Sequence, residues 1–127
     1  MAIGDYFTAR VERIVSGGSG LLRVEGKTVF MDAVAPGDRV AGRVVEDRGS
    51  WARAALVELI EASPHRVEPP CPLYGECGGC SLQHLDYAEQ LVQKKMILED
   101  AFSRIAELGE PPEPRVVPSA PYGYRNR

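Results

Sequence analysis

The sequence has little of several features that define common protein classes. Its 127 residues include only three cysteines, two histidines and one tryptophan. It has no run of about 18 apolar residues, which excludes a membrane-spanning helix, and its first ten residues, MAIGDYFTAR, lack the apolar segment of a secretory signal. The net charge of −3 excludes a uniformly basic nucleic-acid-binding protein, so that any RNA contact must come from a local patch. These absences favour a small cytoplasmic protein with no membrane partner.

The few cysteines all lie within residues 71–80, with the spacing C-x5-C-x2-C. An odd number of clustered cysteines in a cytoplasmic protein is more typical of metal binding than of disulfides. Cys71, Cys77 and Cys80 are therefore candidate ligands of an iron–sulfur cluster or a zinc ion, both of which usually take four ligands. His84 could complete a Cys3His zinc site, or it could be a hydrogen-bonded structural residue beside the loop. The two glycines between the last two cysteines would let the backbone approach a compact centre.

Residues 1–61 have the sequence pattern of a small β domain. Alternating or short apolar runs predict strands near residues 7–11, 21–24, 27–31, 40–44 and 51–60. The pair Glu25-Gly26 predicts a hairpin turn between the second and third of them. Gly17–Gly20 lacks the Lys-Ser/Thr of a phosphate-binding loop and is predicted to be an ordinary turn. Five short strands at this spacing predict a mainly β protein with a five-stranded OB-like barrel.

A Pro-rich linker and the cysteine loop, residues 62–85, precede one long predicted helix, residues 86–109. Asp86 is the expected N-cap, Glu89 can close a capping box, and Gly109 is the expected C-cap. Apolar side chains at helical spacing predict an amphipathic stripe, which Lys94 or Lys95 interrupts and which could pack on the barrel or dock a partner. The stripe consists of Tyr87, Leu91, Leu98, Phe102, Ile105 and Leu108. Residues 110–127 are predicted to be an extended connector.

Several stretches resemble the RNA uracil-5-methyltransferases that carry an N-terminal TRAM domain and a [4Fe–4S] cluster. The matching stretches are PGDRV at 36–40, SPHRVEPPCP at 63–72, CGGC at 77–80, QH at 83–84, Tyr87 with QL at 90–91, and YGYRNR at 122–127. The resemblance covers nearly the whole chain, and the linker with the cysteines is its most specific part.

The resemblance implies a TRAM RNA-binding barrel at residues 1–61, a linker and cluster loop at 62–85, a helix at 86–109 and, at 110–127, a connector to a catalytic domain outside this chain. It implies that Cys71, Cys77 and Cys80 are three of the four ligands of a [4Fe–4S] cluster. The fourth cysteine, the S-adenosylmethionine site, the catalytic cysteine and the general base would lie beyond Arg127. The chain would then be part of an RNA methyltransferase, with no catalytic residue and no activity of its own.

RNA, ribosomal or transfer, is the implied partner, with ribosomal RNA favoured, and no DNA binding is expected. A basic groove with exposed aromatic side chains is how OB-type barrels bind RNA. The candidate contacts are Arg10, Arg13, Arg39, Arg43 and Arg53, with Phe30 and Trp51 as stacking residues. The acidic residues of 1–61 nearly balance all the basic residues of that range, and the two aromatic residues could instead be core. A stand-alone TRAM RNA-binding module with a structural zinc is the alternative function.

Overall fold

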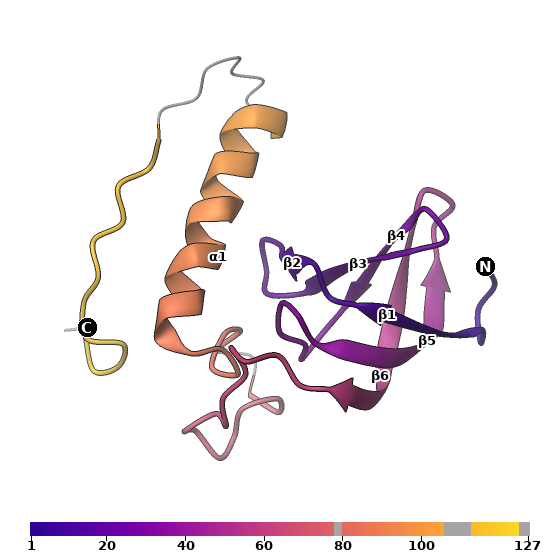
Figure 1. Ribbon diagram of the computed structural model, residues 1–127, viewed down its shortest axis with the longest axis horizontal. Helices are drawn as coiled ribbons and strands as arrows, with labels where there is room; N and C mark the ends of the chain where they lie inside the picture. Colours follow the sequence, from indigo (N-terminus) through magenta and orange to yellow (C-terminus); the bar gives the residue numbers. More distant parts are fainter. Residues whose placement is uncertain (78–79, 106–112, 125–127) are drawn as a thin grey trace. The chain divides into compact units, whose positions relative to one another are not determined.

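The computed structural model describes residues 1–77, 80–105 and 113–124. The chain divides into two units, Met1–Asp86 and Tyr87–Arg127, which are described separately. The first unit contains a six-stranded sheet (Figure 1). Its strands are β1 (Tyr6–Arg10), β2 (Arg13–Ile14), β3 (Gly20–Val24), β4 (Lys27–Met31), β5 (Arg39–Asp47) and β6 (Trp51–Glu61). In the described ranges, no helix is long and apolar enough to cross a membrane.

The strand order in the sheet is β1-β5-β6-β4-β3-β2, and all neighbours are antiparallel except β4 and β6. The mainly β prediction is confirmed, but the prediction of a closed five-stranded barrel is wrong. The first predicted strand is continued, after a break at Val11 and Glu12, by the two-residue strand β2, which pairs with β3 instead of β5. β1 and β2 are thus the two edges of an open hydrogen-bonded ladder, and the chain passes directly from one edge to the other.

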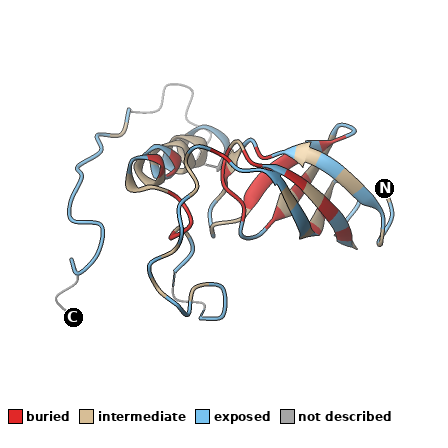
Figure 2. Cartoon of the chain, turned by 60° about the horizontal axis from the view of Figure 1, so that its bottom comes forward, coloured by how far each residue is buried: buried red, intermediate tan, exposed pale blue. Residues whose placement is uncertain are grey.

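The core of the first unit lies on one face of this sheet. Most of its buried members are small or branched apolar side chains, and Figure 2 shows the buried positions of the strands in red. Along β5 the even positions Val40, Gly42 and Val44 are buried while Arg39 and Arg43 are exposed, as period-2 alternation requires. The core cluster consists of Val11, Leu22, Val24, Val29, Met31, Val34, Val40, Val44, Ala52 and Ala54.

The predicted hairpin between β3 and β4 is confirmed. Glu25 and Gly26 have φ values of 51° and 80°, so both central residues of the turn are left-handed. This is the backbone of a two-residue type I′ turn, whose twist matches that of antiparallel strands. Val24 pairs with Lys27 directly beside the turn, and the register continues to Gly20 and Met31.

The second unit consists of helix α1 (Tyr87–Asp100), a π-helical turn η1 (Ala101–Ile105) and the extended residues 113–124. The expected C-cap Gly109 and the stripe residue Leu108 lie outside the described residues. The expected apolar stripe does not form the buried face of α1: its buried residues are Glu89 and Gln93, and Leu98 is exposed. Val92 and Met96, four residues apart on another face, spread the apolar surface around the helix, so α1 is weakly amphipathic.

Candidate functional site

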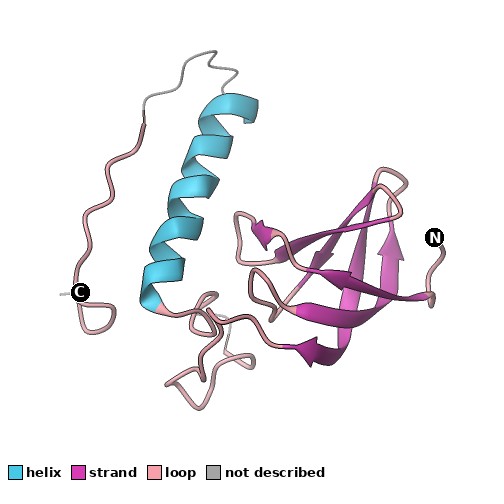
Figure 3. Cartoon of the chain, viewed as in Figure 1, coloured by secondary structure: helices cyan, strands magenta, loops and turns pink. Residues whose placement is uncertain are grey.

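The cysteines lie in the long irregular segment that joins β6 to the start of α1 (Figure 3). All three are free thiols; Cys71 is half-buried, whereas Cys77 and Cys80 are exposed. The loop folds back on itself, because the Tyr74 N–H donates to the Cys71 carbonyl at 3.2 Å and the Cys77 N–H donates to the Leu73 carbonyl at 2.9 Å. Accessible thiols in a turned backbone are what a thiolate-ligated centre needs at its ligand positions.

The cysteine loop carries three thiols, the donor type of an iron–sulfur cluster, but the structure, in the residues that it describes, does not gather them into one site. Thiolates are the usual ligands of such clusters, and no disulfide competes for the sulfur atoms among the described cysteines. Within residues 1–77, 80–105 and 113–124, no three His, Cys, Asp or Glu side chains are gathered closely enough to hold a metal ion. The expected role of Gly78 and Gly79 falls outside the described residues.

Both ring nitrogens of His84 are hydrogen-bonded. Nε2 lies 2.6 Å from the Val34 carbonyl oxygen, and Nδ1 lies 2.7 Å from the Tyr74 hydroxyl. Since a carbonyl can only accept, Nε2 carries the proton and Nδ1 of the neutral ring accepts from Tyr74. Burial lowers the pKa of His84 below its ordinary value, and the charge of Arg66 acts in the same direction. The interpretation of His84 as a hydrogen-bonded residue beside the loop is confirmed, and zinc binding would require it to give up one of these bonds.

A buried ion pair joins the sheet to the start of the linker. Asp38 is fully buried, and its carboxylate accepts hydrogen bonds from the Ala35 N–H at 2.8 Å, the Ser63 N–H at 2.7 Å and Nη2 of Arg66 at 2.7 Å. Nη2 of Arg66 also donates to the Ala33 carbonyl at 2.9 Å. Burial alone would raise the pKa of Asp38, but the bonds from Arg66, Ala35 and Ser63 outweigh it and lower the pKa.

The residues between β4 and β5 therefore hold the linker and the cysteine loop at two places. Asp38 holds Arg66, and the Val34 carbonyl holds His84. The loop also approaches the turn before β3, where a Cβ atom on Gly18 would lie 2.6 Å from Cβ of Ser81, so that only glycine fits there. The cysteine loop is thus attached to the sheet by specific bonds on more than one side.

Sequence reasoning missed Asp38, Arg66, Tyr74 and Gln83 as residues that shape this loop. Asp38 and Arg66 are 28 positions apart, and no periodic pattern links residues at that separation. The only available signal was that both lie in the stretches on which the family resemblance rests. Gln83 lies in such a stretch too, and its Oε1 accepts from the Cys71 N–H at 3.1 Å.

The candidate RNA contacts all project from the outer face of the sheet, in two groups. The first group is on β1 and β5, where Arg10 is paired with Arg39 and Arg43 with Tyr6. Arg10 lies 3.5 Å from Glu61, whereas Arg39 and Arg43 are exposed and have no ion-pair partner among the described residues. Tyr6, with 71% of its surface exposed, was not predicted; its place on the polar side of the β1 alternation was the signal that could have found it.

The second group of candidate contacts lies on β4 and β6. Phe30 is paired with Arg53, and its ring packs edge-on against Trp51 with centroids 5.7 Å apart. Both rings are half-buried, so they are neither fully buried core residues nor fully exposed stacking residues. Arg13 is on β2, opposite Leu21. The structure therefore brings together Arg10, Arg39 and Arg43 on β1 and β5, and Phe30, Trp51 and Arg53 on β4 and β6, whereas Arg13 belongs to neither group.

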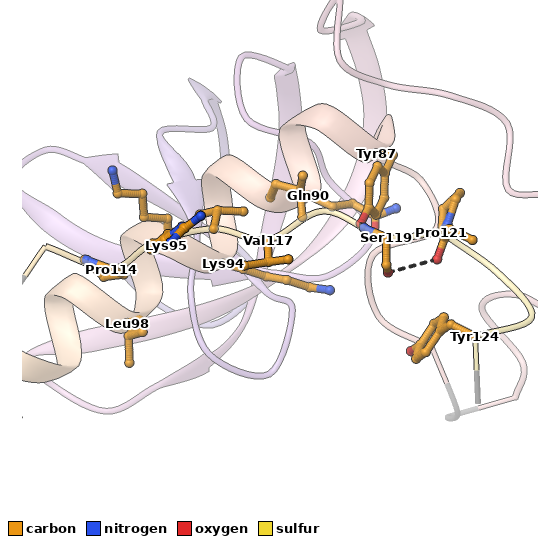
Figure 4. Close-up of a pocket in the computed structure, with 14 residues that line it drawn as sticks. Tyr87, Gln90, Lys94, Lys95, Leu98, Pro114, Val117, Ser119, Pro121 and Tyr124 are labelled. Atoms are coloured by element: carbon orange, nitrogen blue, oxygen red, sulfur yellow. Dashed lines mark hydrogen bonds between the residues drawn. The ribbon is translucent and has the colours of Figure 1, made fainter. Parts of the chain in front are cut away.

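The second unit contains a groove between α1 and the extended segment 113–124 (Figure 4). Its volume is about 400 Å³, and its walls combine Lys94 and Leu98 of the helix with Val117 of the segment. The segment is held at two points: the Ser119 N–H donates to the Tyr87 hydroxyl at 2.9 Å, and Lys95 pairs with Glu113 at 3.0 Å. The lysines thus line this groove beside the apolar stripe that they were expected to interrupt.

No family model matches the chain. Curated relatives do match it over almost all of its length. An uncharacterized RNA methyltransferase of Aquifex aeolicus is 42% identical over 92% of the chain. The 23S rRNA (uracil(1939)-C(5))-methyltransferases RlmD of Acidithiobacillus ferrooxidans and of Azoarcus sp. are 44% and 40% identical over 92% and 94% of it.

The chain spans only 27–28% of the length of these relatives. Among solved structures, a conserved protein of Methanococcus maripaludis aligns with 46% of this chain and 83% of its own, at 24% identity and a TM-score of 0.43. Identities of 40–44% over more than nine-tenths of the chain show that it is homologous to the matching part of these relatives. The chain is therefore similar, over almost all of its own length, to RNA methyltransferases that include 23S rRNA uracil-C5 methyltransferases, and it spans a little over a quarter of their length.

Proposed function

We propose that this chain is the RNA-binding and iron–sulfur region of an S-adenosylmethionine-dependent RNA uridine C5-methyltransferase, with ribosomal RNA as the substrate. The observation that carries the proposal is the 40–44% identity to two 23S rRNA uracil-C5 methyltransferases over more than 90% of the chain. Because the chain spans about a quarter of those relatives, the methyl-transfer site is assigned to the remainder of a longer protein.

The proposed reaction needs groups that this chain does not supply. A cysteine adds to C6 of uridine, C5 then attacks the methyl group of S-adenosylmethionine, and a base removes the C5 proton so that the cysteine can leave. Cys71, Cys77 and Cys80 are assigned to metal ligation, so none of them is the nucleophile. The role of this region is then to bind the RNA and to hold the ligand loop.

Cys71, Cys77 and Cys80 would hold an iron–sulfur cluster, whose fourth ligand lies outside these 127 residues. When bound, such a cluster cross-links the chain segments that ligate it and can carry an electron. Three free thiols in one turned loop support this assignment. The engaged ring of His84 argues against the alternative of a Cys3His zinc site.

The outer face of β1 and β5 is the proposed RNA-binding surface. Arg39 and Arg43 are exposed cations without ion-pair partners among the described residues, and Tyr6 adds an exposed ring opposite Arg43. Cations that are free of acidic partners can bind phosphates without first breaking an ion pair, and an exposed ring can stack on a base. Arg10 lies in the same group but is already paired with Glu61.

The proposal is tested on the native protein and on the 127-residue chain in parallel. We expect the native protein to transfer a labelled methyl group from S-adenosylmethionine to C5 of a uridine in unmodified 23S rRNA, and the short chain to bind that RNA without methylating it. Iron and acid-labile sulfide in the native protein, lost on Cys77→Ser, would support the ligand assignment. One zinc per chain without iron would favour the zinc module instead, and methyl transfer by the short chain would refute the division of roles.

A further inference from the structure

We propose that Tyr74 is a positioning residue, which fixes the cysteine loop to the sheet before any metal binds, through a relay from its hydroxyl to the His84 ring and on to the Val34 carbonyl. The relay is a property of the metal-free chain. Only its purpose, the presentation of ligands to a metal centre, rests on the proposed function.

Tyr74 contacts the ligand loop through its backbone. Its N–H donates to the carbonyl of Cys71 at 3.2 Å, and it forms an isolated β-bridge with Cys77. Tyr74 is therefore linked through its backbone to two of the three candidate ligands, Cys71 and Cys77.

The side chain of Tyr74 connects this loop to the sheet unit. Its hydroxyl lies 2.7 Å from Nδ1 of His84, and the two rings are stacked with centroids 5.8 Å apart. On the other side of the ring, Nε2 of His84 lies 2.6 Å from the carbonyl of Val34, a fully buried residue of the core. The path from the ligand loop to the core of the sheet thus consists of two short hydrogen bonds and one buried ring.

The hydroxyl group is the part of Tyr74 that matters in this arrangement. Replacing it by hydrogen leaves the stacked ring in place. It also leaves Nδ1 of His84 without its donor, inside a residue that is only 2% exposed. An unsatisfied buried acceptor is costly, so the ring or the loop must shift to find another partner. Gln83 also restrains Cys71, because its Oε1 accepts a hydrogen bond from the Cys71 N–H, but this bond does not involve the His84 ring.

The first test measures hydrogen exchange in the metal-free chain. In Tyr74→Phe we expect the backbone amides of Tyr74 and Cys77 to exchange roughly five- to tenfold faster, the change expected for the loss of one net hydrogen bond, while the amides of β3 and β4 stay protected. Tyr87→Phe is the matched control, because it also removes one bonded phenol, on Ser119, and lies in the other unit. Equal exchange of the loop amides in the wild type and Tyr74→Phe would overturn the proposal.

The second test measures metal affinity with Co²⁺, whose thiolate complexes absorb strongly, as the probe. Partners that orient a metal ligand typically change affinity by about 10- to 100-fold, so we expect Tyr74→Phe to bind Co²⁺ at least about tenfold more weakly. His84→Gln, which keeps a donor for Val34 and an acceptor for Tyr74, should recover most of the affinity that His84→Leu loses. Equal affinity in all variants would refute the metal-presenting role, even if exchange had changed.

The two tests separate this inference from the proposed function. If the wild-type chain binds neither Co²⁺ nor iron, the cluster assignment fails, whereas the exchange experiment still decides whether Tyr74 positions the loop. If the wild-type chain binds metal and Tyr74→Phe shows unchanged exchange and affinity, the cluster assignment survives and the positioning role is wrong.

Discussion

Two arginine-bearing regions of the first unit differ in how their charges are satisfied. At the junction of sheet and linker, Arg66 is bound to a fully buried carboxylate and to a backbone carbonyl. On the outer face of β1 and β5, Arg39 and Arg43 are exposed, with no ion-pair partner among the described residues. Arginine is therefore structural in one region and available to a ligand in the other. The difference lies in whether a carboxylate or carbonyl nearby binds the guanidinium.

The energetic contrast follows from desolvation. A buried pair such as Asp38 and Arg66 is costly to break, because removal of one partner leaves the other charge buried and unpaired. An exposed pair such as Arg10 and Glu61 contributes little, because water screens it and both side chains lose freedom. Substitutions in the two regions should therefore differ in what they change: folding stability at the junction, and RNA affinity on the outer face.

The largest expected effect is that of Asp38→Asn. The substitution removes the charge that holds Arg66 and turns one acceptor oxygen into a donor facing the Ala35 or Ser63 N–H. We expect a loss of about 3 kcal/mol in the free energy of unfolding, measured by urea denaturation. Asp32→Asn is the matched control, since its side chain is 78% exposed, and should cost no more than about 0.5 kcal/mol. Similar losses in the two variants would mean that the buried carboxylate of Asp38 contributes no more to stability than an exposed one.

The next effect concerns RNA. Arg39→Ala combined with Arg43→Ala should weaken binding of a 23S rRNA fragment about tenfold and reduce the slope of log affinity against log salt by about 1.4, for two lost phosphate contacts. Thermal unfolding should change little, because both side chains are exposed.

The control for this pair is Arg23→Ala with Arg48→Ala, which removes two exposed arginines that are paired with Glu12 and Glu46. Equal losses of affinity in both double variants would indicate non-specific attraction. An unchanged affinity and salt slope in Arg39→Ala with Arg43→Ala would remove this face as the RNA site.

The sequence predicted most of the strands, because alternation and turn residues are local signals. The hairpin at Glu25 and Gly26 and the outward direction of Arg39 and Arg43 follow from them directly. The open ladder did not follow, because only the strand partners show that the run beginning at Phe7 changes from β5 to β3. Strand pairing is a long-range property, on which a period-2 pattern carries no information.

The candidate site could be predicted only in part. Clustered cysteines are visible in any sequence, whereas the bonds that hold their loop join residues far apart, such as Val34 and His84. For the helix, the sequence predicted something that the structure does not show. The apolar spacing predicted a buried stripe, but Glu89 and Gln93 are the buried positions. Periodicity says which residues share a face, and the surroundings decide which face is buried.

A smaller effect on the free energy of unfolding is expected from pH, through His84 near the junction of sheet and linker. Burial lowers the pKa of His84 below its ordinary 6.5, and the charge of Arg66 acts in the same direction, while the hydrogen bond to Val34 and the charge of Asp38 oppose them. The unfolded chain therefore takes up a proton before the folded one. The stability that neutral His84 contributes is complete above pH 6.5 and is lost as the pH falls from there towards the lowered pKa of the folded state.

We expect unfolding free energies measured from pH 7 to 5 to fall more steeply in the wild type than in His84→Gln, by at most about 1.4 kcal/mol per pH unit. The comparison cancels the contributions of the titratable groups that both chains share. Parallel curves would mean that the His84 ring does not have to stay neutral in the folded chain.

The smallest effect should come from Arg10→Ala. The Arg10 guanidinium donates to the Gly37 carbonyl at 2.7 Å and lies 3.5 Å from Glu61, but the side chains of Arg10 and Glu61 are 55% and 65% exposed. Water can replace both interactions, so urea denaturation should show a loss of at most about 0.5 kcal/mol. Arg66→Ala, whose side chain is 24% exposed, should cost several times more because it leaves Asp38 buried and unpaired. If the two arginine variants lost equal stability, local partners and burial would not distinguish structural arginines from those available to RNA.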